Sequence, residues 1–294
     1  MPELEHRKIN VHTTSFDLEA WTILALRTSK TVLHVFSGGD DSKLIASELQ
    51  LKSSQTHAEV DIHNLQPRVV FRDMRTHSAG IISITSLGQP PDHPTGALSD
   101  GVGLENSLPF IILTGSYDEH LRLFHFFPAQ GTQPMGKLEL HSELKTPGGV
   151  WRIQALDADS TDKPISRGKE WLLLIANHTG GAHIVRVVLS LTQPGANDIA
   201  KWHYNMTVEA SFTAGHESLV YAAAARYEEF DSGYYKGWHD SSKVKRWDVV
   251  STSFYDKKIC NWSWIDRARS NESATRDMEA RLEAEQSNTT DPVD

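Results

Sequence analysis

One short pattern recurs along this chain and restricts the folds open to it: an apolar run, a polar turn with an aspartate, and a second, alternating run. Its copies are FSGGDDSKLIA around Asp41, LTGSYDEHLRL around Asp118 and STSFYDKKICNW around Asp256. Two strand-like runs joined by a short polar turn indicate a β-hairpin. An aspartate in such a turn can accept hydrogen bonds from backbone N–H groups. A weaker fourth copy, LLLIANHTGGAHIVRV, has glycines where the aspartate would stand.

A further strand-like segment precedes each hairpin. The four segments are LEAWTILAL, THSAGIISITS, GGVWRIQAL and GHESLVYAAAA, and AEVDIHN and MGKLELH are expected to add an outer strand to two of the units. Units of about four short strands, repeated along a chain, are typical of the blades of a β-propeller. The sequence therefore predicts an all-β fold, a WD40-type β-propeller with about four visible blades.

The blades are expected at about 10–65, 66–140, 141–200 and 201–266. Asp41 and Asp118 are 77 residues apart, against the ~40–45 residues of a regular WD40 repeat. The excess has the composition of surface insertions and lies in LGQPPDHPTGALSDGVGLENSLP, DADSTDKPISRGK and ARYEEFDSGYYKGWHDSSK. After the propeller, 267–294 is expected to form a short helix and a disordered acidic tail. Because an open set of blades would expose a strand edge, we expect the four blades to be part of a larger ring.

Charge and composition exclude several functional classes. The 294 residues include 38 acidic and 29 basic side chains, a net charge of -9, whereas a nucleic-acid partner requires a basic face. The single cysteine, Cys260, cannot form an intrachain disulfide and indicates a reducing compartment. The start MPELEHRKIN lacks the apolar segment of a signal peptide, and no apolar run approaches the roughly 20 residues of a membrane helix. We expect a cytoplasmic protein without nucleic-acid or membrane partners.

Six segments together resemble one WD40 family, the diphthine methyltransferases, also called diphthine methylesterases, of diphthamide biosynthesis. They are GGDDSKL, HSAGIISI, TGSYDEHLRL, GGVWRI, HESLVY and STSFYDKKICNW, in the order of the family, and they cover roughly 18–264. The third strand departs from the usual Trp-Asp ending, with LFHF and IASE in its place. Since the family's propeller has about seven blades, the resemblance implies that this chain corresponds to the C-terminal portion of a seven-bladed ring.

The resemblance implies a carboxylic ester hydrolase that needs no cofactor. Its implied substrate is the methyl ester of methylated diphthine on elongation factor 2, and the products are methanol and a free carboxylate. Two alternatives remain open: a non-catalytic WD40 scaffold for protein partners, and an inactive truncated form of the enzyme. GGVWRI and HESLVY favour the enzyme, because a generic scaffold need not contain them.

The residues themselves name no nucleophile, since the chain has neither a G-x-S-x-G elbow nor an H-E-x-x-H motif, and no metal site is predicted. In a propeller the start of each blade's first strand shares a rim with the hairpin turns. On that rim we expect two catalytic histidines, His120 and His216. Candidate substrate-binding residues on it are Trp21, Trp151, Arg152, Tyr221 and Glu217, and the rim is also expected to hold Glu19, His77, Tyr117, Glu119 and Tyr255.

Each of these assignments has a structural alternative. Asp41, Asp118 and Asp256 are expected to be structural turn residues, because they recur where no chemistry could be repeated. His77 and His216 stand where a WD40 blade has its structural histidine, and Trp151 is equally compatible with the core.

Overall fold

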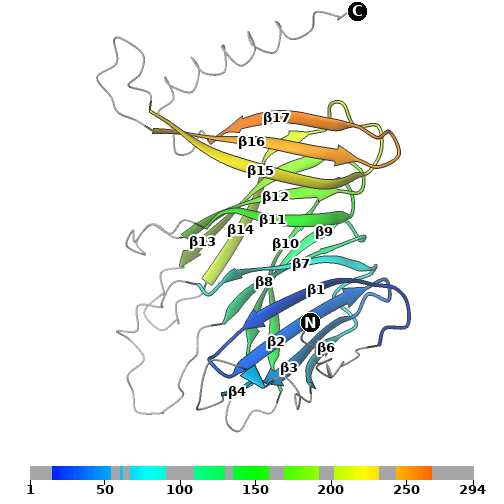
Figure 1. The fold of residues 1–294 in the computed structure, drawn as a ribbon, viewed down its shortest axis with the longest axis vertical. Helices are drawn as coiled ribbons and strands as arrows, with labels where there is room; N and C mark the ends of the chain where they lie inside the picture. Colours follow the sequence, from blue (N-terminus) through cyan, green and yellow to red (C-terminus); the bar gives the residue numbers. More distant parts are fainter. Residues whose placement is uncertain are drawn as a thin grey trace, which may run out of the picture.

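The computed structural model describes residues 15–53, 60–61, 67–90, 109–129, 135–158, 169–191, 202–231 and 243–266. Within these ranges every regular element is a β-strand, and the strands form four antiparallel sheets and one short two-stranded pair. The sheets follow one another along the longest axis of the molecule (Figure 1). The helix and tail expected at 267–294 lie outside the described residues, as do the central parts of the expected insertions.

Apart from the first sheet, where one short strand pair intervenes, each large sheet consists of strands that are consecutive in sequence. The first sheet contains β1 (Ala20–Arg27), β2 (Val32–Gly39), β3 (Leu44–Gln50) and β6 (Arg68–Asp73). The second contains β7 (Ile81–Gly88), β8 (Phe110–Ser116), β9 (His120–Phe127) and β10 (Lys137–Lys145). The third contains β11 (Val150–Ala158), β12 (Lys169–Asn177), β13 (Ala182–Leu191) and β14 (Trp202–Phe212). The last contains β15 (Val220–Asp231), β16 (Lys243–Ser253) and β17 (Ile259–Ile265), and β4 (Lys52–Ser53) pairs separately with β5 (Val60–Asp61).

This strand order is that of propeller blades: each sheet is an antiparallel meander, and successive sheets pack face to face. The first strands of the sheets contact one another in turn, β1 with β7, β7 with β11 and β11 with β15. They therefore form one inner surface, as the first strand of each blade does in a propeller. The prediction of an all-β fold with four propeller-type blades is confirmed. No helix in the described part of the chain is long and apolar enough to cross a membrane.

Three core clusters lie between the sheets and explain why both faces of the middle sheets are apolar. β12 shows this most clearly, because its side chains alternate between two clusters. One cluster, toward the second sheet, receives Trp171, Leu173 and Ile175. The other, toward the last sheet, receives Leu172, Leu174 and Ala176. The continuous apolar run WLLLIA is therefore a strand buried on both faces.

The outer strand of the first sheet was wrongly expected at AEVDIHN. The described part of that segment, β5, pairs with β4, and β6 forms the fourth strand instead. β6 takes this place because Val70 is fully buried in the core between the first two sheets, beside Phe36 and Leu44. The first sheet therefore extends to Asp73, beyond the expected limit near residue 65.

The third expected insertion was also placed too early. Residues 225–231, ARYEEFD, continue β15 as a strand that pairs with β16. The register puts Glu228 opposite Arg246, and opposite charges across an antiparallel pair favour the strand. The charged composition of 225–231 therefore belongs to a strand, and the rest of the expected insertion up to residue 242 lies outside the described residues.

Candidate functional site

The hairpin turns of the four sheets share one backbone contact, which identifies equivalent positions without reference to sequence. The first residue after the second strand donates its N–H to the carbonyl oxygen of the residue that precedes the first strand. We call this residue the turn residue. The four pairs are Asp40 with Glu19 (2.9 Å), Tyr117 with Gly80 (2.9 Å), His178 with Gly149 (2.7 Å) and Phe254 with Leu219 (3.2 Å).

A second set of equivalent positions comes from a β-bulge at the start of each sheet. The register of the first strand shifts by one at its second residue, so that this residue has no partner on the second strand. A bulge bends the strand and redirects the side chain of the extra residue. The bulged residues are Trp21, Ile82, Trp151 and Tyr221.

These two sets meet in an aromatic cluster, which we define as Trp21, Tyr117, Trp151, His178, Tyr221 and Phe254. Trp151 lies at its centre, with ring centroids 5.9 Å from Trp21, 5.6 Å from Tyr117 and 5.0 Å from Tyr221. His178 lies 6.3 Å from Trp151, and Phe254 lies 5.8 Å from Tyr221. Trp151 is only 9% exposed, whereas Trp21 and Tyr221 are 44% and 39% exposed. Side chains from all four sheets thus form one aromatic surface at one end of the strands.

Asp40 brings a negative charge to the edge of this cluster. It is the turn residue of the first sheet, and a Cβ built on Gly80 would lie 2.7 Å from its Oδ1 and 3.3 Å from Cδ2 of Tyr117. Burial, and then the negative charge of Asp40, raise the pKa of the Tyr117 phenol. The Asp40 carboxylate has no hydrogen-bond or ion-pair partner among the described residues.

The three turn aspartates make a different contact, which they share. Each accepts the backbone N–H of the residue three positions before the first strand: Asp41 from Asp17 (3.0 Å), Asp118 from Ser78 (3.0 Å) and Asp256 from Glu217 (2.8 Å). The residue after each aspartate has a positive φ, between 56° and 65°. Asp118 also accepts two hydrogen bonds of 2.9 Å from Nη1 of Arg122. These contacts fasten the hairpin to the segment that enters the sheet.

The last hairpin has one residue more than the others before its aspartate. Tyr117 alone separates β8 from Asp118, but both Phe254 and Tyr255 separate β16 from Asp256. Superposing the sequences on their aspartates therefore pairs Tyr255 with Tyr117, whereas the backbone contact pairs Phe254 with Tyr117.

Of the two candidate catalytic histidines, His216 has both ring nitrogens engaged. Nδ1 lies 2.8 Å from Oγ of Ser253 and Nε2 lies 2.7 Å from Oγ of Ser251. Burial lowers the pKa of His216. His77 occupies the equivalent position in the second sheet, four residues before its first strand. Its Nε2 lies 2.8 Å from Oγ1 of Thr114, and burial lowers the pKa of His77 to about 4. The geometry favours the structural role for both.

His120 is arranged differently and keeps one nitrogen for an external partner. It begins β9 and is partly exposed, and its Nδ1 lies 2.7 Å from the backbone carbonyl oxygen of Asp118. Because a carbonyl oxygen can only accept, Nδ1 must carry the hydrogen. In the neutral ring Nε2 then has a free lone pair, which is the form that a general base requires.

Arg152 and Glu217, two further candidate binding residues, differ in whether they already have a partner. Arg152 follows the bulged Trp151, is exposed, and has no hydrogen-bond or ion-pair partner among the described residues. The exposed carboxylate of Glu217 accepts a hydrogen bond of 2.7 Å from Nζ of Lys258. Arg152 is therefore available to a ligand, whereas Glu217 would first have to give up its ion pair.

Three members of this region did not follow from the sequence: Asp40, His178 and Phe254. All three are turn residues, and the signal that marks them is their position directly after the second strand. Their side chains differ in chemistry, so no residue pattern connects them. In the part of the chain that the structure describes, no group of three or more His, Cys, Asp and Glu side chains is placed to hold a metal ion.

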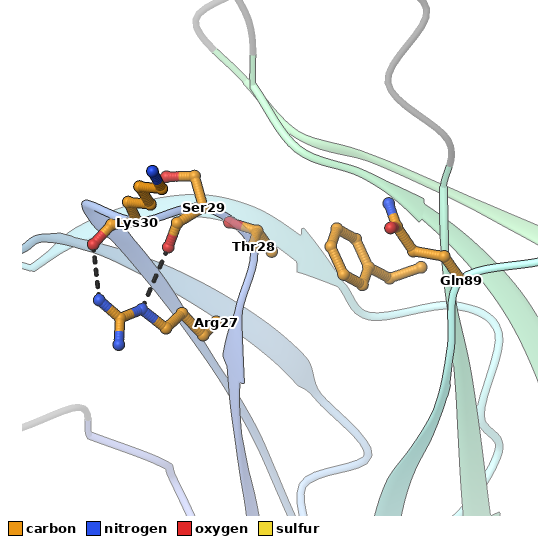
Figure 2. A pocket seen from close by; sticks show the side chains of 6 residues that line it. Arg27, Thr28, Ser29, Lys30 and Gln89 are labelled. Atoms are coloured by element: carbon orange, nitrogen blue, oxygen red, sulfur yellow. Dashed lines mark hydrogen bonds between the residues drawn. The ribbon is translucent and has the colours of Figure 1, made fainter.

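A surface hollow lies at the other end of β1 and contains none of these residues. It is lined by Arg27, Thr28, Ser29, Lys30, Gln89 and Phe110 (Figure 2). Figure 2 shows the Arg27 guanidinium donating to the carbonyl oxygens of Ser29 and Lys30, at 3.2 and 2.7 Å. Arg27 thus stabilises its own turn. Since Arg27 is six residues from Trp21 along β1, this hollow lies about 20 Å from the aromatic cluster.

Comparison with known proteins gives two relatives of similar sequence. The diphthine methyltransferase of Saccharomyces cerevisiae is 24% identical over 255 residues, covering 84% of this chain and 49% of that protein. The diphthine methyltransferase of Schizosaccharomyces pombe is 24% identical over 250 residues, covering 85% of this chain and 52% of that protein. The chain therefore spans about half the length of the relatives it matches.

No family model matches the chain. Among solved structures, the WD40 domain of SCAP from fission yeast aligns with 87% of this chain and 67% of that domain, at 8% identity and a TM-score of 0.29. Over most of its length, this chain resembles the diphthine methyltransferase family.

Proposed function

We propose that this chain acts in diphthamide biosynthesis as a carboxylic ester hydrolase. Its substrate would be the methyl ester of methylated diphthine on elongation factor 2, and its products methanol and the free carboxylate. The observation that supports this most is the aromatic cluster, in which Trp21, Trp151 and Tyr221 meet from three sheets at one end of the strands. The names of the two relatives, both diphthine methyltransferases, support a role in diphthamide biosynthesis.

A modified histidine on a large protein can reach only an open site. The exposed faces of Trp21 and Tyr221 offer such a surface, on which an imidazole ring can stack. Arg152, beside Trp151, would bind the carboxylate product and the negative oxygen that develops during the reaction. Its guanidinium has no partner among the described residues that would compete for it.

The chemical step requires one base and one water molecule. We assign the base to Nε2 of His120, whose lone pair is free when Nδ1 donates to the carbonyl oxygen of Asp118. The base takes a proton from water, the water oxygen bonds to the ester carbon, and the bond to the methoxy oxygen breaks. The proton passes to the methoxy group, so that methanol leaves. His216 is a second candidate proton carrier, though its two serine contacts would have to open first.

Arg152→Ala and His120→Ala should each lower ester cleavage at least roughly tenfold, or about 1.4 kcal/mol of activation free energy. Neither change should lower the melting temperature, because Arg152 is exposed and the His120 ring bonds only to its own turn. The assay measures methanol released from methylated elongation factor 2 by the purified chain. His203→Ala, an exposed histidine on β14, is the matched control.

If the chain is instead a scaffold, the parent chain and these variants should behave differently. Exposed aromatic residues such as Phe254 (58%) and Tyr255 (72%) are also typical of protein-binding surfaces. A scaffold would bind elongation factor 2 without releasing methanol, and Arg152→Ala would weaken that binding. Full ester cleavage by the Arg152→Ala, His120→Ala double variant would remove both residues from the mechanism. A lack of cleavage by the chain, when a full-length relative is active, would identify an inactive truncated form.

A further inference from the structure

The surface hollow at the other end of β1 is basic, although the chain as a whole has a net charge of -9. Its lining includes Arg27 and Lys30 from the turn between β1 and β2, and Gln89 and Phe110 from the second sheet. Figure 2 shows the turn on one side of the hollow and Gln89 on the other. No carboxylate is among the described residues that line it. A hollow lined by charge of one sign concentrates ions of the opposite sign, so an anion is the ligand that this one favours.

Neither of the two cations forms an ion pair with a carboxylate of the described residues. Arg27 donates from Nε and Nη2 to the carbonyl oxygens of Ser29 and Lys30, which are uncharged acceptors. Its Nη1 has no hydrogen-bond partner in the described part of the chain, and neither does the ammonium group of Lys30. We therefore assign Nη1 of Arg27 and Nζ of Lys30 as donors to an external anion.

The turn that carries these cations is held in place by its own hydrogen bonds. The backbone N–H of Thr28 donates to the carbonyl oxygen of Val32 at 3.1 Å, and Oγ1 of Thr28 lies 2.9 Å from Nδ1 of His34, which is fully buried. The N–H of Thr31 donates to Oγ of Ser29 at 3.2 Å, which leaves the hydroxyl hydrogen of Ser29 for another acceptor. A turn fixed in this way loses little conformational freedom on binding, so its donors are preorganised.

Phe110 gives the hollow an apolar wall. It is 9% exposed and otherwise belongs to the core between the first two sheets. The hollow has a volume of about 520 Å³. Since small-molecule sites typically have volumes of roughly 300–1,000 Å³, it has room for a ring beside an anionic group. An aromatic ring of a ligand can pack against that of Phe110.

We propose that this hollow binds a small phosphate monoester that contains an aromatic ring, of the size of a nucleoside monophosphate. The phosphate oxygens accept hydrogen bonds from Arg27, Lys30 and Ser29, and the ring packs against Phe110. A phosphate monoester carries a charge of about −1.5 to −2 at pH 7, which suits two cations better than a single carboxylate does. The hollow lies about 20 Å from the aromatic cluster, so the inference goes beyond the proposed ester hydrolysis and holds whether or not the chain cleaves an ester.

The test is a calorimetric titration of the purified chain with adenosine monophosphate at low ionic strength. We expect saturable binding with a dissociation constant of about 0.1–1 mM. Adenosine, which lacks the charge, and inorganic phosphate, which lacks the ring, should each bind more weakly. Lys30→Gln should weaken the binding of adenosine monophosphate about three- to fivefold, whereas Lys30→Arg, which keeps the charge, should preserve it. Lys30 is an exposed turn residue, so both variants should fold as the parent chain does.

Two further variants separate the hollow from general effects of charge. Lys145→Gln removes the same charge from an exposed residue of β10 and should bind adenosine monophosphate as the parent chain does. Phe110→Leu removes the ring and should weaken the binding of adenosine monophosphate about two- to threefold, but not that of inorganic phosphate.

Three results would overturn the inference. The first is the absence of saturable binding of adenosine monophosphate, or an equal affinity for adenosine. The second is an equal loss of binding in Lys30→Gln and Lys145→Gln, which would mean that only the overall charge matters. The third is tighter binding of a phosphotyrosine peptide than of adenosine monophosphate, which would assign the hollow to a protein partner.

Discussion

At the scale of single residues, buried histidines dominate the expected response to pH. His125 is 2% exposed between the second and third sheets, where its Nε2 lies 2.5 Å from Oη of Tyr204 and its ring lies 3.8 Å from that of His141. Burial, and then the neighbouring His141, lower the pKa of His125 to about 3. Burial lowers the pKa of His77 to about 4.

Stability should therefore fall as the pH falls below 6.5, the ordinary histidine pKa. In that range the unfolded chain takes up protons that the folded chain refuses, at about 1.4 kcal/mol per pH unit for each such histidine. Above pH 6.5 this contribution is fully present. Urea unfolding at about pH 7.5 and about pH 5 measures it. If the unfolding free energy did not change between these two pH values, the pKa values of His77 and His125 could not be lowered in the folded chain.

Asp118→Ala should damage the fold more than any chemistry. The change removes the acceptor of the Ser78 N–H and leaves Arg122, which is 6% exposed, with only the longer contact to Glu143 at 3.5 Å. Losing one partner of a buried pair costs about 3 kcal/mol or more. Asp256→Ala, in the more exposed last hairpin, should cost less in the same urea titration. If Asp118→Ala kept the parent melting temperature but lost activity, Asp118 would be a functional residue rather than a structural one.

At the scale of elements, the close approach of the second and third sheets depends on Gly115 in β8. A Cβ there would lie 2.3 Å from Oγ of Ser83 and 2.5 Å from the carbonyl oxygen of Val150. The second contact is with backbone, so a side-chain rotation cannot relieve it. The start of β11, which supports Trp151, would have to move.

Gly115→Ala should consequently lower the free energy of unfolding by about 1–3 kcal/mol, as overpacking of a core does. It should also change the tryptophan fluorescence, because Trp151 adjoins the displaced Val150. Thermal unfolding with fluorescence detection measures both. The control is Ala224→Ser, which adds one atom to a strand residue that is exposed to solvent. An unperturbed Gly115→Ala would mean that the sheets tolerate a wider separation.

The strands follow from the sequence more directly than the contacts between them do. Alternation and apolar runs predicted the hairpins, and the segments around Trp21, Trp151 and Tyr221 were assigned to first strands that the structure contains. The bulges could not be predicted, because they are a register relation between two strands. Asp40, His178 and Phe254 share a backbone contact rather than a side-chain type. The prediction of an outer strand at AEVDIHN was wrong because alternation alone does not determine which strand packs against the core.

At the scale of the whole molecule, the four sheets form an open series whose two ends lie far apart (Figure 1). The first sheet exposes Ile23 (70%) and Val69 (42%), and the last exposes Val250 (43%) and Ile259 (73%). The last sheet has three strands among the described residues, which leaves β17 as an edge. Because these apolar side chains and the edge of β17 are exposed, we propose that the series is part of a seven-bladed ring.

An isolated open series of sheets should self-associate or bind an apolar dye. Unpaired strand edges can pair with a second molecule, and exposed apolar faces favour association. Light scattering after size-exclusion chromatography measures the first, and dye fluorescence the second. Ile259→Lys, which places a charge on the exposed edge strand, should reduce both. Clean monomeric behaviour with low dye binding would instead favour a small closed ring.

The alternation of β12 between two cores has a consequence for how the molecule loses its structure. Its odd-numbered apolar residues belong to the core shared with the second sheet, and its even-numbered ones to the core shared with the last sheet. In a linear array, an end unit can open when only one interface is lost, but an interior unit must lose two. Local opening should therefore start in the first and last sheets and reach β12 last. The aromatic cluster, whose members come from both ends of the array, would lose its outer rings while Trp151 still held its place.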